Sequence, residues 1–161
     1  MHNNSVRLLQ LVSGLLDFSR LEAGKMEVHR EPLDITELTQ AVAGDFHPAM
    51  KRKRLDIELS LSVPKRHVRM DRYLYERILF NLLSNAVKFT PEGGSIRVAL
   101  GQEGTKLSLL VRDTGIGVSE IDRRGLFQKF RQVESSATRR FEGTGLGLAL
   151  VKEFSGLLGG S

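Results

Sequence analysis

The segment from Asp71 to Phe89 constrains the fold most, because its apolar residues predict a long helix that is largely buried. Asp71 is a suitable N-cap for that helix. Four polar residues are separated by 4, 4 and 3 positions and therefore share one stripe: Arg77, Asn81, Asn85 and Lys88. A polar stripe on a buried helix needs partners, since an unpaired buried amide costs about 1–3 kcal/mol. The stripe indicates either a ligand-binding surface or the solvent-facing side of an ordinary amphipathic helix.

Around this helix, the chain mixes strand-like and helix-like segments. Strict alternation of apolar and polar residues predicts three strands, the last two forming an antiparallel hairpin, at 55–61, 96–100 and 107–111. Helical periodicity predicts three further helices, at about 5–22, 34–50 and 145–157. A weaker alternation predicts a short strand over 26–30. We expect an α+β fold, a two-layer α/β sandwich with a mixed sheet and helices on one face, preceded by a long N-terminal helix.

The composition narrows the class of protein. Hydrophobic residues make up 40% of the 161 residues and charged residues 27%, as in an ordinary globular domain with a short appendage. No apolar run approaches the roughly 20 residues that span a bilayer. The first residues are polar, unlike a secretory signal, and cysteine is absent. We expect a cytoplasmic location.

The net charge of +5 raises the question of a nucleic-acid partner. Basic residues cluster at 51–54, at 65–66 and between 123 and 140. Aromatic residues make up only 6% and tryptophan is absent, so the chain offers no evident platform for stacking bases. We expect no nucleic-acid partner, because a solvated surface or a polyphosphate ligand explains the charge as well.

The N-terminal helix carries a wide apolar stripe. Its residues follow 3-4-3 spacing with apolar neighbours beside them: Leu8, Leu11, Leu15 and Phe18, widened by Leu9, Val12 and Leu16. Such width suits a helix in a bundle or a coiled-coil dimer, and equally a helix docked on the core of its own chain. Ala23 and Gly24 supply a C-terminal stop.

Two glycine-containing motifs follow the predicted hairpin. In Asp113–Gly117, an acidic residue at a strand end precedes two glycines, so a carboxylate beside a permissive backbone could accept from an amino group such as that of adenine. An ordinary Asp-Gly turn is the alternative. In Gly143–Leu148, closely spaced glycines open a helix, whose N-terminus favours an anion. Glycines required for tight packing are the alternative there.

The order of these motifs is more specific than any one of them. The runs NLLSNAVKFT (81–90), DTGIG (113–117), LFQKF (126–130) and GTGLGLAL (143–150) resemble the N, G1, F and G2 boxes of sensor histidine kinase catalytic domains, within the GHKL ATPase superfamily. The stretch 8–28 resembles the second helix of the family's dimerisation domain and the junction after it. The resemblance implies three parts: the C-terminal helix of the dimerisation and phosphoacceptor domain (1–25), a junction (26–32) and the catalytic ATP-binding domain (33–161).

The resemblance also implies a site for ATP and Mg²⁺. Asn85 would ligand the metal, Asn81 would support the phosphate or metal region, and Lys88 would contact phosphate. Asp113 would accept from the adenine amino group. Other residues would line the base pocket, anchor the lid or approach the phosphates: Gly115, Ile116, Gly117, Phe127, Phe130, Gly143, Thr144, Gly145, Leu146 and Gly147. Within the lid (118–142), Arg139 would meet a terminal phosphate, with Arg140 as the alternative.

Two features depart from the family pattern. The family's phosphoacceptor lies on a first bundle helix, and no histidine here has its sequence context: His2, His29, His47 and His67. His29 is expected at the surface. The family also continues into two further strands beyond the position of residue 161, so we expect a fragment whose sheet has an exposed edge.

The expected function is that of the ATP-binding catalytic domain of a two-component sensor histidine kinase. It would donate the γ-phosphate to a histidine on a dimerisation helix outside this chain, would not phosphorylate itself, and would serve a response regulator receiver domain. The parent would be a homodimer, free or anchored in the inner membrane. One alternative, a GHKL ATPase that hydrolyses ATP, is disfavoured because Asn81 stands where those enzymes carry a general-base Glu. The other, a degenerate nucleotide-binding regulatory module, is disfavoured because all four boxes are intact.

Overall fold

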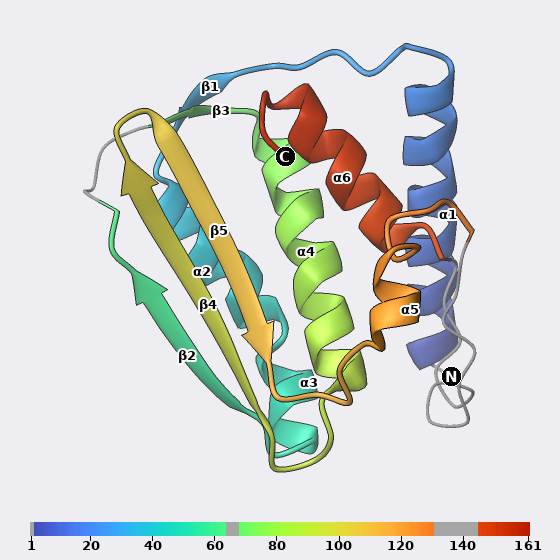
Figure 1. Ribbon diagram of the computed structural model, residues 1–161, viewed down its shortest axis with the longest axis vertical. Helices are drawn as coiled ribbons and strands as arrows, with labels where there is room; N and C mark the ends of the chain where they lie inside the picture. Colours follow the sequence, from blue (N-terminus) through green and yellow to red (C-terminus); the bar gives the residue numbers. More distant parts are fainter. Residues whose placement is uncertain (1, 64–67, 131–144) are drawn as a thin grey trace. The chain divides into compact units, whose positions relative to one another are not determined.

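The computed structural model describes residues 2–63, 68–130 and 145–161, which form two compact units (Figure 1). The sheet unit comprises His29–Val118, and the helical unit comprises Met1–Val28 and Ser119–Ser161. None of the described helices combines the length and the apolar character that crossing a bilayer requires. We describe each unit by itself.

The sheet unit contains two sheets. The main sheet has the strand order β2–β4–β5, formed by β2 (Asp56–Leu61), β4 (Ser95–Glu103) and β5 (Lys106–Asp113). Strand β2 runs parallel to β4, and β4 pairs antiparallel with β5, with Val98 opposite Val111. The small sheet pairs β1 (Glu31–Leu33) antiparallel with β3 (Val68–Met70). The mixed sheet and the predicted hairpin are both confirmed.

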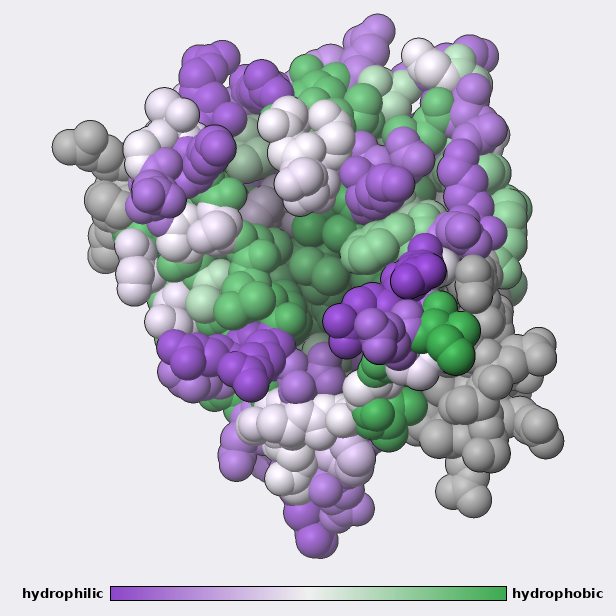
Figure 2. Space-filling view, in the orientation of Figure 1, coloured by the Kyte–Doolittle hydropathy of each residue, from purple (hydrophilic) through white to green (hydrophobic). Residues whose placement is uncertain are grey.

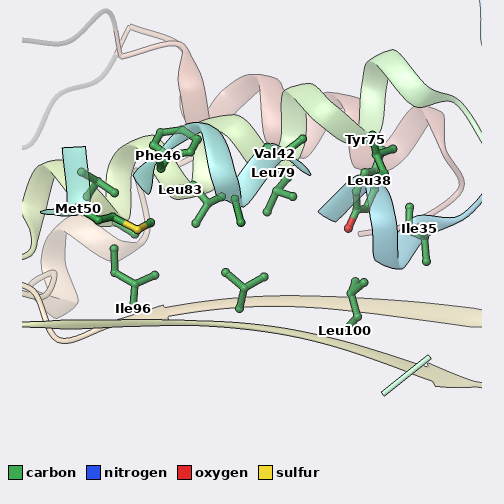
Figure 3. Close-up of a cluster of buried hydrophobic side chains, with 14 of the residues drawn as sticks. Ile35, Leu38, Val42, Phe46, Met50, Tyr75, Leu79, Leu83, Ile96 and Leu100 are labelled. Carbon is green, nitrogen blue, oxygen red and sulfur yellow. The ribbon is translucent and has the colours of Figure 1, made fainter. Parts of the chain in front are cut away.

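Helices cover one face of the main sheet. Figure 3 shows α2 (Ile35–Asp45) and α4 (Arg72–Phe89) on the same side, with Ile96 and Leu100 of β4 pointing toward them. Leu79 and Leu83 of α4 are fully buried in this core. The burial of these leucines confirms that the apolar part of α4 faces inward and that the fold is α+β with helices on one face.

Strand β5 is an edge strand of the main sheet in the described structure. Leu107, Leu109 and Val111 are half-buried, and Leu110 is 53% exposed. Figure 2 shows hydrophobic residues at the surface over the middle of this strand. Among the described residues, this edge of the main sheet is therefore unpaired and partly apolar.

Aspartates begin both long helices of the sheet unit, as predicted. Asp34 accepts from two backbone N–H groups in the first turn of α2, at 3.0 and 3.1 Å. Asp71 is 5% exposed, and its Oδ1 accepts from the Leu74 N–H at 2.9 Å. Its Oδ2 accepts from the N–H of the exposed residue His29 at 2.7 Å. Asp71 therefore joins the start of α4 to the segment that precedes β1.

A buried hydroxyl pair joins α2 to α4. Thr39 Oγ1 donates its single proton to Ile35 O at 2.6 Å, so the Tyr75 hydroxyl must be the donor in the 2.7 Å bond to Thr39. Burial raises the pKa of Tyr75 to about 12. The tyrosine therefore stays neutral and keeps its proton for Thr39.

Two predicted elements differ from the structure. The helix expected over 34–50 is two helices, α2 and α3 (His47–Arg52), because Pro48 lies in the first turn of α3 and has no N–H to continue the preceding helix. The strand expected over 26–30 was wrong, since β1 begins at Glu31 and includes Pro32. Proline is tolerated there because β1 belongs to a two-stranded sheet. Strand β3 was not predicted.

The helical unit contains α1 (His2–Glu22), α5 (Glu120–Arg123) and α6 (Gly147–Leu157). Helices α1 and α6 contact each other, and a Cβ added at the buried Gly14 would lie 4.0 Å from Leu150 Cδ1. Gly24, at φ +63°, follows α1 as the predicted stop. Four apolar side chains of α1 remain exposed: Leu8, Val12, Leu15 and Leu16. This part of the predicted stripe is uncovered in the described chain.

Candidate functional site

The predicted polar stripe lies on α4 and is half-buried along its length. Asn81 Nδ2 donates to Arg77 O at 2.8 Å, which leaves Oδ1 as the acceptor of that amide. The side-chain amide of Asn85 has no hydrogen-bonding partner among the described residues. Lys88 Nζ lies 4.7 Å from the centroid of the Phe89 ring. The stripe therefore presents amide oxygens and a cation at the edge of the core.

The C-terminal end of α4 is held by several donors. The last four carbonyl groups of a helix lack partners within it. Ala86 O accepts from the N–H and from the hydroxyl of Thr90, at 3.0 and 2.6 Å. Phe89 O accepts from the N–H of Ile116 at 3.3 Å. The bond between the Ile116 N–H and Phe89 O joins the end of α4 directly to the motif that contains Asp113.

The remaining carbonyl groups at this end bind a lysine side chain. Lys53 Nζ donates to Val87 O at 2.7 Å, to Lys88 O at 3.1 Å and to Thr90 O at 2.8 Å. An ammonium group has three protons, and these three bonds can use all of them. Its charge also opposes the partial negative charge of a helix C-terminus.

Asp113 is the last residue of β5 and is exposed. Its Oδ1 accepts from the Gly115 N–H at 2.8 Å, which orients the carboxylate. A Cβ at Gly115 would lie 2.5 Å from that Oδ1 and 2.7 Å from Phe89 O, so no larger residue fits. Gly117 has φ +70°, which favours glycine, and Ile116 is 46% exposed. The motif thus combines a fixed carboxylate, open backbone and an exposed apolar side chain.

Hydrogen bonds also connect this motif to the turn after α4. The Thr114 N–H donates to Ser95 O at 3.0 Å, and the Ser95 N–H donates to Thr114 Oγ1 at 2.9 Å. A Cβ at Gly94 would lie 2.4 Å from Thr90 Cγ2, so the turn is tightly packed. Together with the bond from the Ile116 N–H to Phe89 O, these bonds hold residues 113–117 against the C-terminal end of α4 and the start of β4 within the sheet unit.

The other predicted site residues belong to the helical unit or lie outside the description. Phe130 has φ +60° and is 60% exposed; its N–H donates to Gly145 O at 3.1 Å. Leu146 is buried and precedes Gly147, the first residue of α6. Arg139, Arg140, Gly143 and Thr144 lie outside the described residues.

Phe130, one of the two predicted lid anchors, packs against α1. Its ring meets Phe18 of α1 edge-on, with centroids 5.4 Å apart. The neighbouring Lys129 forms an ion pair with Glu22, and this hydrogen-bonded carboxylate raises the pKa of the lysine. Phe127 is 48% exposed. The ring contact of Phe130 and the ion pair of Lys129 are thus with α1, and neither Phe127 nor Phe130 is part of the buried core.

Comparison with known proteins identifies the family. The family model described as "Histidine kinase-, DNA gyrase B-, and HSP90-like ATPase" matches residues 70–161, more than half of the chain. The chain belongs to this ATPase family. The matched range begins just before α4 and includes the stripe, residues 113–117 and the glycines before α6.

Several relatives of this ATPase-family chain are histidine kinases. An uncharacterized sensor-like histidine kinase of Rhizobium meliloti is 37% identical over 99% of the chain, which spans 30% of that protein. The circadian input-output histidine kinase CikA of Synechococcus elongatus is also 37% identical over 99% of the chain, which spans 22% of it. The crystal structure of full-length ShkA in complex with AMPPNP has a TM-score of 0.82 and 34% identity, and the match covers 96% of this chain and 32% of ShkA.

Two contributors to this ATPase-family site were missed from the sequence. Lys53 was counted within the basic cluster 51–54, and nothing in the sequence separates it from its exposed neighbours Lys51 and Arg52. Thr90 ends the family-like run, and no function is predicted for it from the sequence. It is 1% exposed and caps α4. A threonine directly before proline at a helix end was the one local indication of that cap.

Replacing Gly115 with alanine should damage the joint between α4 and β5. We predict that Gly115→Ala lowers the free energy of unfolding by about 1–3 kcal/mol, because the new methyl group would overlap Asp113 Oδ1 and Phe89 O. Urea unfolding followed by circular dichroism measures the change. The matched control is Gly44→Ala in α2, where a Cβ meets nothing within 4 Å. This control should be stabilising by about 0.5–1 kcal/mol; equal stability of Gly115→Ala and the original chain would show that the packing is not as described.

Proposed function

We propose that this chain binds Mg-ATP and acts as the phosphodonor domain of a two-component sensor histidine kinase. The observation that carries the proposal is the hydrogen bond from the Ile116 N–H to Phe89 O. Through it, the helix that carries the Asn85 side-chain amide and the loop that carries the oriented Asp113 carboxylate share one end of the sheet unit. Membership of the ATPase family and the histidine kinase relatives support the same conclusion.

Asp113 is the proposed receptor for adenine. Because its Oδ1 is engaged by the Gly115 N–H, its Oδ2 is the oxygen that would accept from the exocyclic amino group. A hydrogen bond to a charged group contributes about 1.5–3 kcal/mol. Gly115 and Gly117 leave the backbone uncovered, and the exposed Ile116 offers apolar surface to a base. These properties fit a purine with an amino substituent.

Asn85 is the proposed protein ligand of Mg²⁺. Its amide oxygen is a hard donor, and it has no competing hydrogen bond among the described residues. No group of three His, Cys, Asp or Glu side chains in the described ranges could hold a metal. That fits an ion bound largely through nucleotide phosphates, whose charge it would neutralise. Lys88 would contact phosphate, and Asn81 would support this region.

The phosphate side of the proposed site rests on the family resemblance alone. It assigns phosphate or lid contacts to Phe130, Arg139, Gly143, Thr144, Gly145, Leu146 and Gly147.

In the transfer step, a histidine ring nitrogen would attack the γ-phosphorus, the bond to the bridging oxygen would break, and ADP would leave. Positioning and charge neutralisation are what such a step mainly requires. An Asn81 amide cannot take a proton from water at neutral pH, which disfavours hydrolysis.

We further propose that the parent protein is a cytoplasmic or membrane-anchored homodimer that serves a response regulator. Residues 1–25 would belong to its dimerisation domain, with 26–32 as junction and 33–161 as catalytic domain. Leu8, Val12, Leu15 and Leu16 support this assignment, because they leave an apolar strip of α1 exposed. Burial against another helix of the dimer would remove this strip from water.

The Asp113→Asn variant tests the adenine assignment. We predict that it binds ATP at least about tenfold more weakly, since an amide nitrogen in place of the carboxylate oxygen loses a charge-assisted bond. The variant should also lose preference for ATP over ITP, whose base carries a carbonyl oxygen in place of the amino group. Calorimetry with both nucleotides and Mg²⁺ measures this. Asp45→Asn, an equal charge change at the exposed end of α2, is the control; unchanged ATP preference in Asp113→Asn would remove Asp113 from the base pocket.

The chain should not phosphorylate itself. Incubation with γ-labelled ATP and Mg²⁺ should leave no acid-labile label on the chain alone, because none of its four histidines has the family's phosphoacceptor context. The same preparation should label a separately produced phosphoacceptor bundle of a parent kinase. Label retained on this chain without that bundle would contradict the proposal.

A further inference from the structure

We propose that Lys53 is a positioning residue for nucleotide binding, which sets the C-terminal end of α4 so that the Asn85 amide and the Asp113 carboxylate keep their relative positions. The inference rests on the proposed function, but it concerns a residue outside all four family-like boxes. Lys53 itself would touch neither the nucleotide nor the metal.

Lys53 is fixed at both of its ends. Its ammonium group binds three carbonyl groups of the α4 terminus, at 2.7, 3.1 and 2.8 Å. Its own backbone carbonyl accepts from the N–H of Gly93 at 3.1 Å, in the turn that follows α4. The side chain therefore acts as a brace between the end of α3 and the end of α4.

The backbone around Lys53 is held in an uncommon conformation. The N–H of Leu55 donates to Met50 O at 3.0 Å, and the N–H of Arg54 donates to Lys51 O at 3.2 Å, the pattern of a Schellman motif. This motif places a left-handed residue after the helix, and here Arg54 takes that place with φ +52°. Residues other than glycine adopt this left-handed conformation at a cost in free energy. The buried Met50 and Leu55 hold it in place.

The carbonyl group of Phe89 connects the helix end that Lys53 binds to the proposed base pocket. Among carbonyls 87–90, Lys53 binds those of Val87, Lys88 and Thr90, and Ile116 binds that of Phe89. Without the ammonium group, three acceptors would have to find other donors, and the last turn of α4 would loosen. Phe89 O would then move relative to the Ile116 N–H, and with it the loop that orients Asp113.

The neighbouring cations do not share this arrangement. Lys51 and Arg52 are exposed, whereas Lys53 is half-buried. Lys51→Met therefore provides a control with the same change in charge and side-chain type. Lys53→Met removes the three hydrogen bonds and keeps a long side chain. Lys53→Arg keeps a charge and several donors, although its planar group cannot match three converging acceptors as an ammonium group does.

Calorimetry with ATP and Mg²⁺ on the whole chain provides the first measurement. Lys53→Met should bind ATP about tenfold more weakly, as expected when a shift of the site weakens a charge-assisted bond. Lys53→Arg should recover part of the loss, and Lys51→Met should bind as the original chain does. In a double-mutant cycle, Asp113→Asn should cost less affinity in the Lys53→Met background, because the carboxylate is already misplaced there.

Amide hydrogen exchange provides the second measurement and needs no nucleotide. The Ile116 N–H should exchange faster in Lys53→Met than in Lys51→Met, at a temperature where circular dichroism shows both chains folded. Should Lys53→Met fail to fold, Lys53→Arg carries the same comparisons.

The outcomes separate the two proposals. Equal ATP affinity in Lys53→Met and the original chain, or strictly additive effects in the cycle, would overturn the role of Lys53 and leave the proposed function standing. Absence of ATP binding by the folded original chain would overturn both.

Discussion

The carbonyl groups at the C-terminal end of α4 are the constraint on which the candidate site depends. A long helix that is buried on its apolar side needs donors for its last four carbonyl groups. In this chain the donors come from Thr90, from Lys53 and from the Ile116 N–H. Meeting this requirement also places residues 113–117 against the end of α4. The same bonds that complete the helix therefore assemble the site.

This arrangement explains why glycines recur where the C-terminal end of α4 lies against residues 113–117. Gly94 and Gly115 lie where a Cβ would approach other atoms to 2.4 and 2.5 Å. Gly117 adopts a positive φ. The backbone is thus brought close to the helix end at two points and left uncovered beside the carboxylate of Asp113. A flat base with an amino group could lie against such a surface without displacing a side chain.

The helical unit suggests how the chain is used within a larger protein. Helices α1 and α6 contact each other beside Gly14 and Leu150, whereas several leucines of α1 remain exposed. One side of α1 is therefore covered within the chain, and another is available to a further helix. The sequence left open whether the stripe packs in a bundle or on the chain's own core, and the structure shows that part of α1 packs against α6 of the same chain.

Local patterns predicted most of the sheet unit. Asp34 and Asp71 were identified as caps because N-capping involves neighbouring residues, and the β4–β5 hairpin followed from alternation around a glycine turn. The break between α2 and α3 follows from Pro48, which interrupts an apolar periodicity that otherwise continues through residue 50. The β1–β3 pairing and the contacts of Lys53 join residues more than 30 positions apart, and no local pattern encodes them. The polar stripe on α4 and the acidic loop at 113–117 were therefore predictable from local patterns. The contacts of Lys53 with the end of α4 were not.

The central claim is that a nucleotide binds where α4 and β5 end together. Titration of the ¹⁵N-labelled chain with AMPPNP and Mg²⁺, followed by amide chemical shifts, tests it most directly. The largest changes within the sheet unit should occur at Asn85, Lys88 and residues 113–117. Arg97 and Leu110, which lie on exposed positions of β4 and β5, should change little. Changes centred on those two residues, or no changes at residues 113–117 at saturation, would contradict the claim.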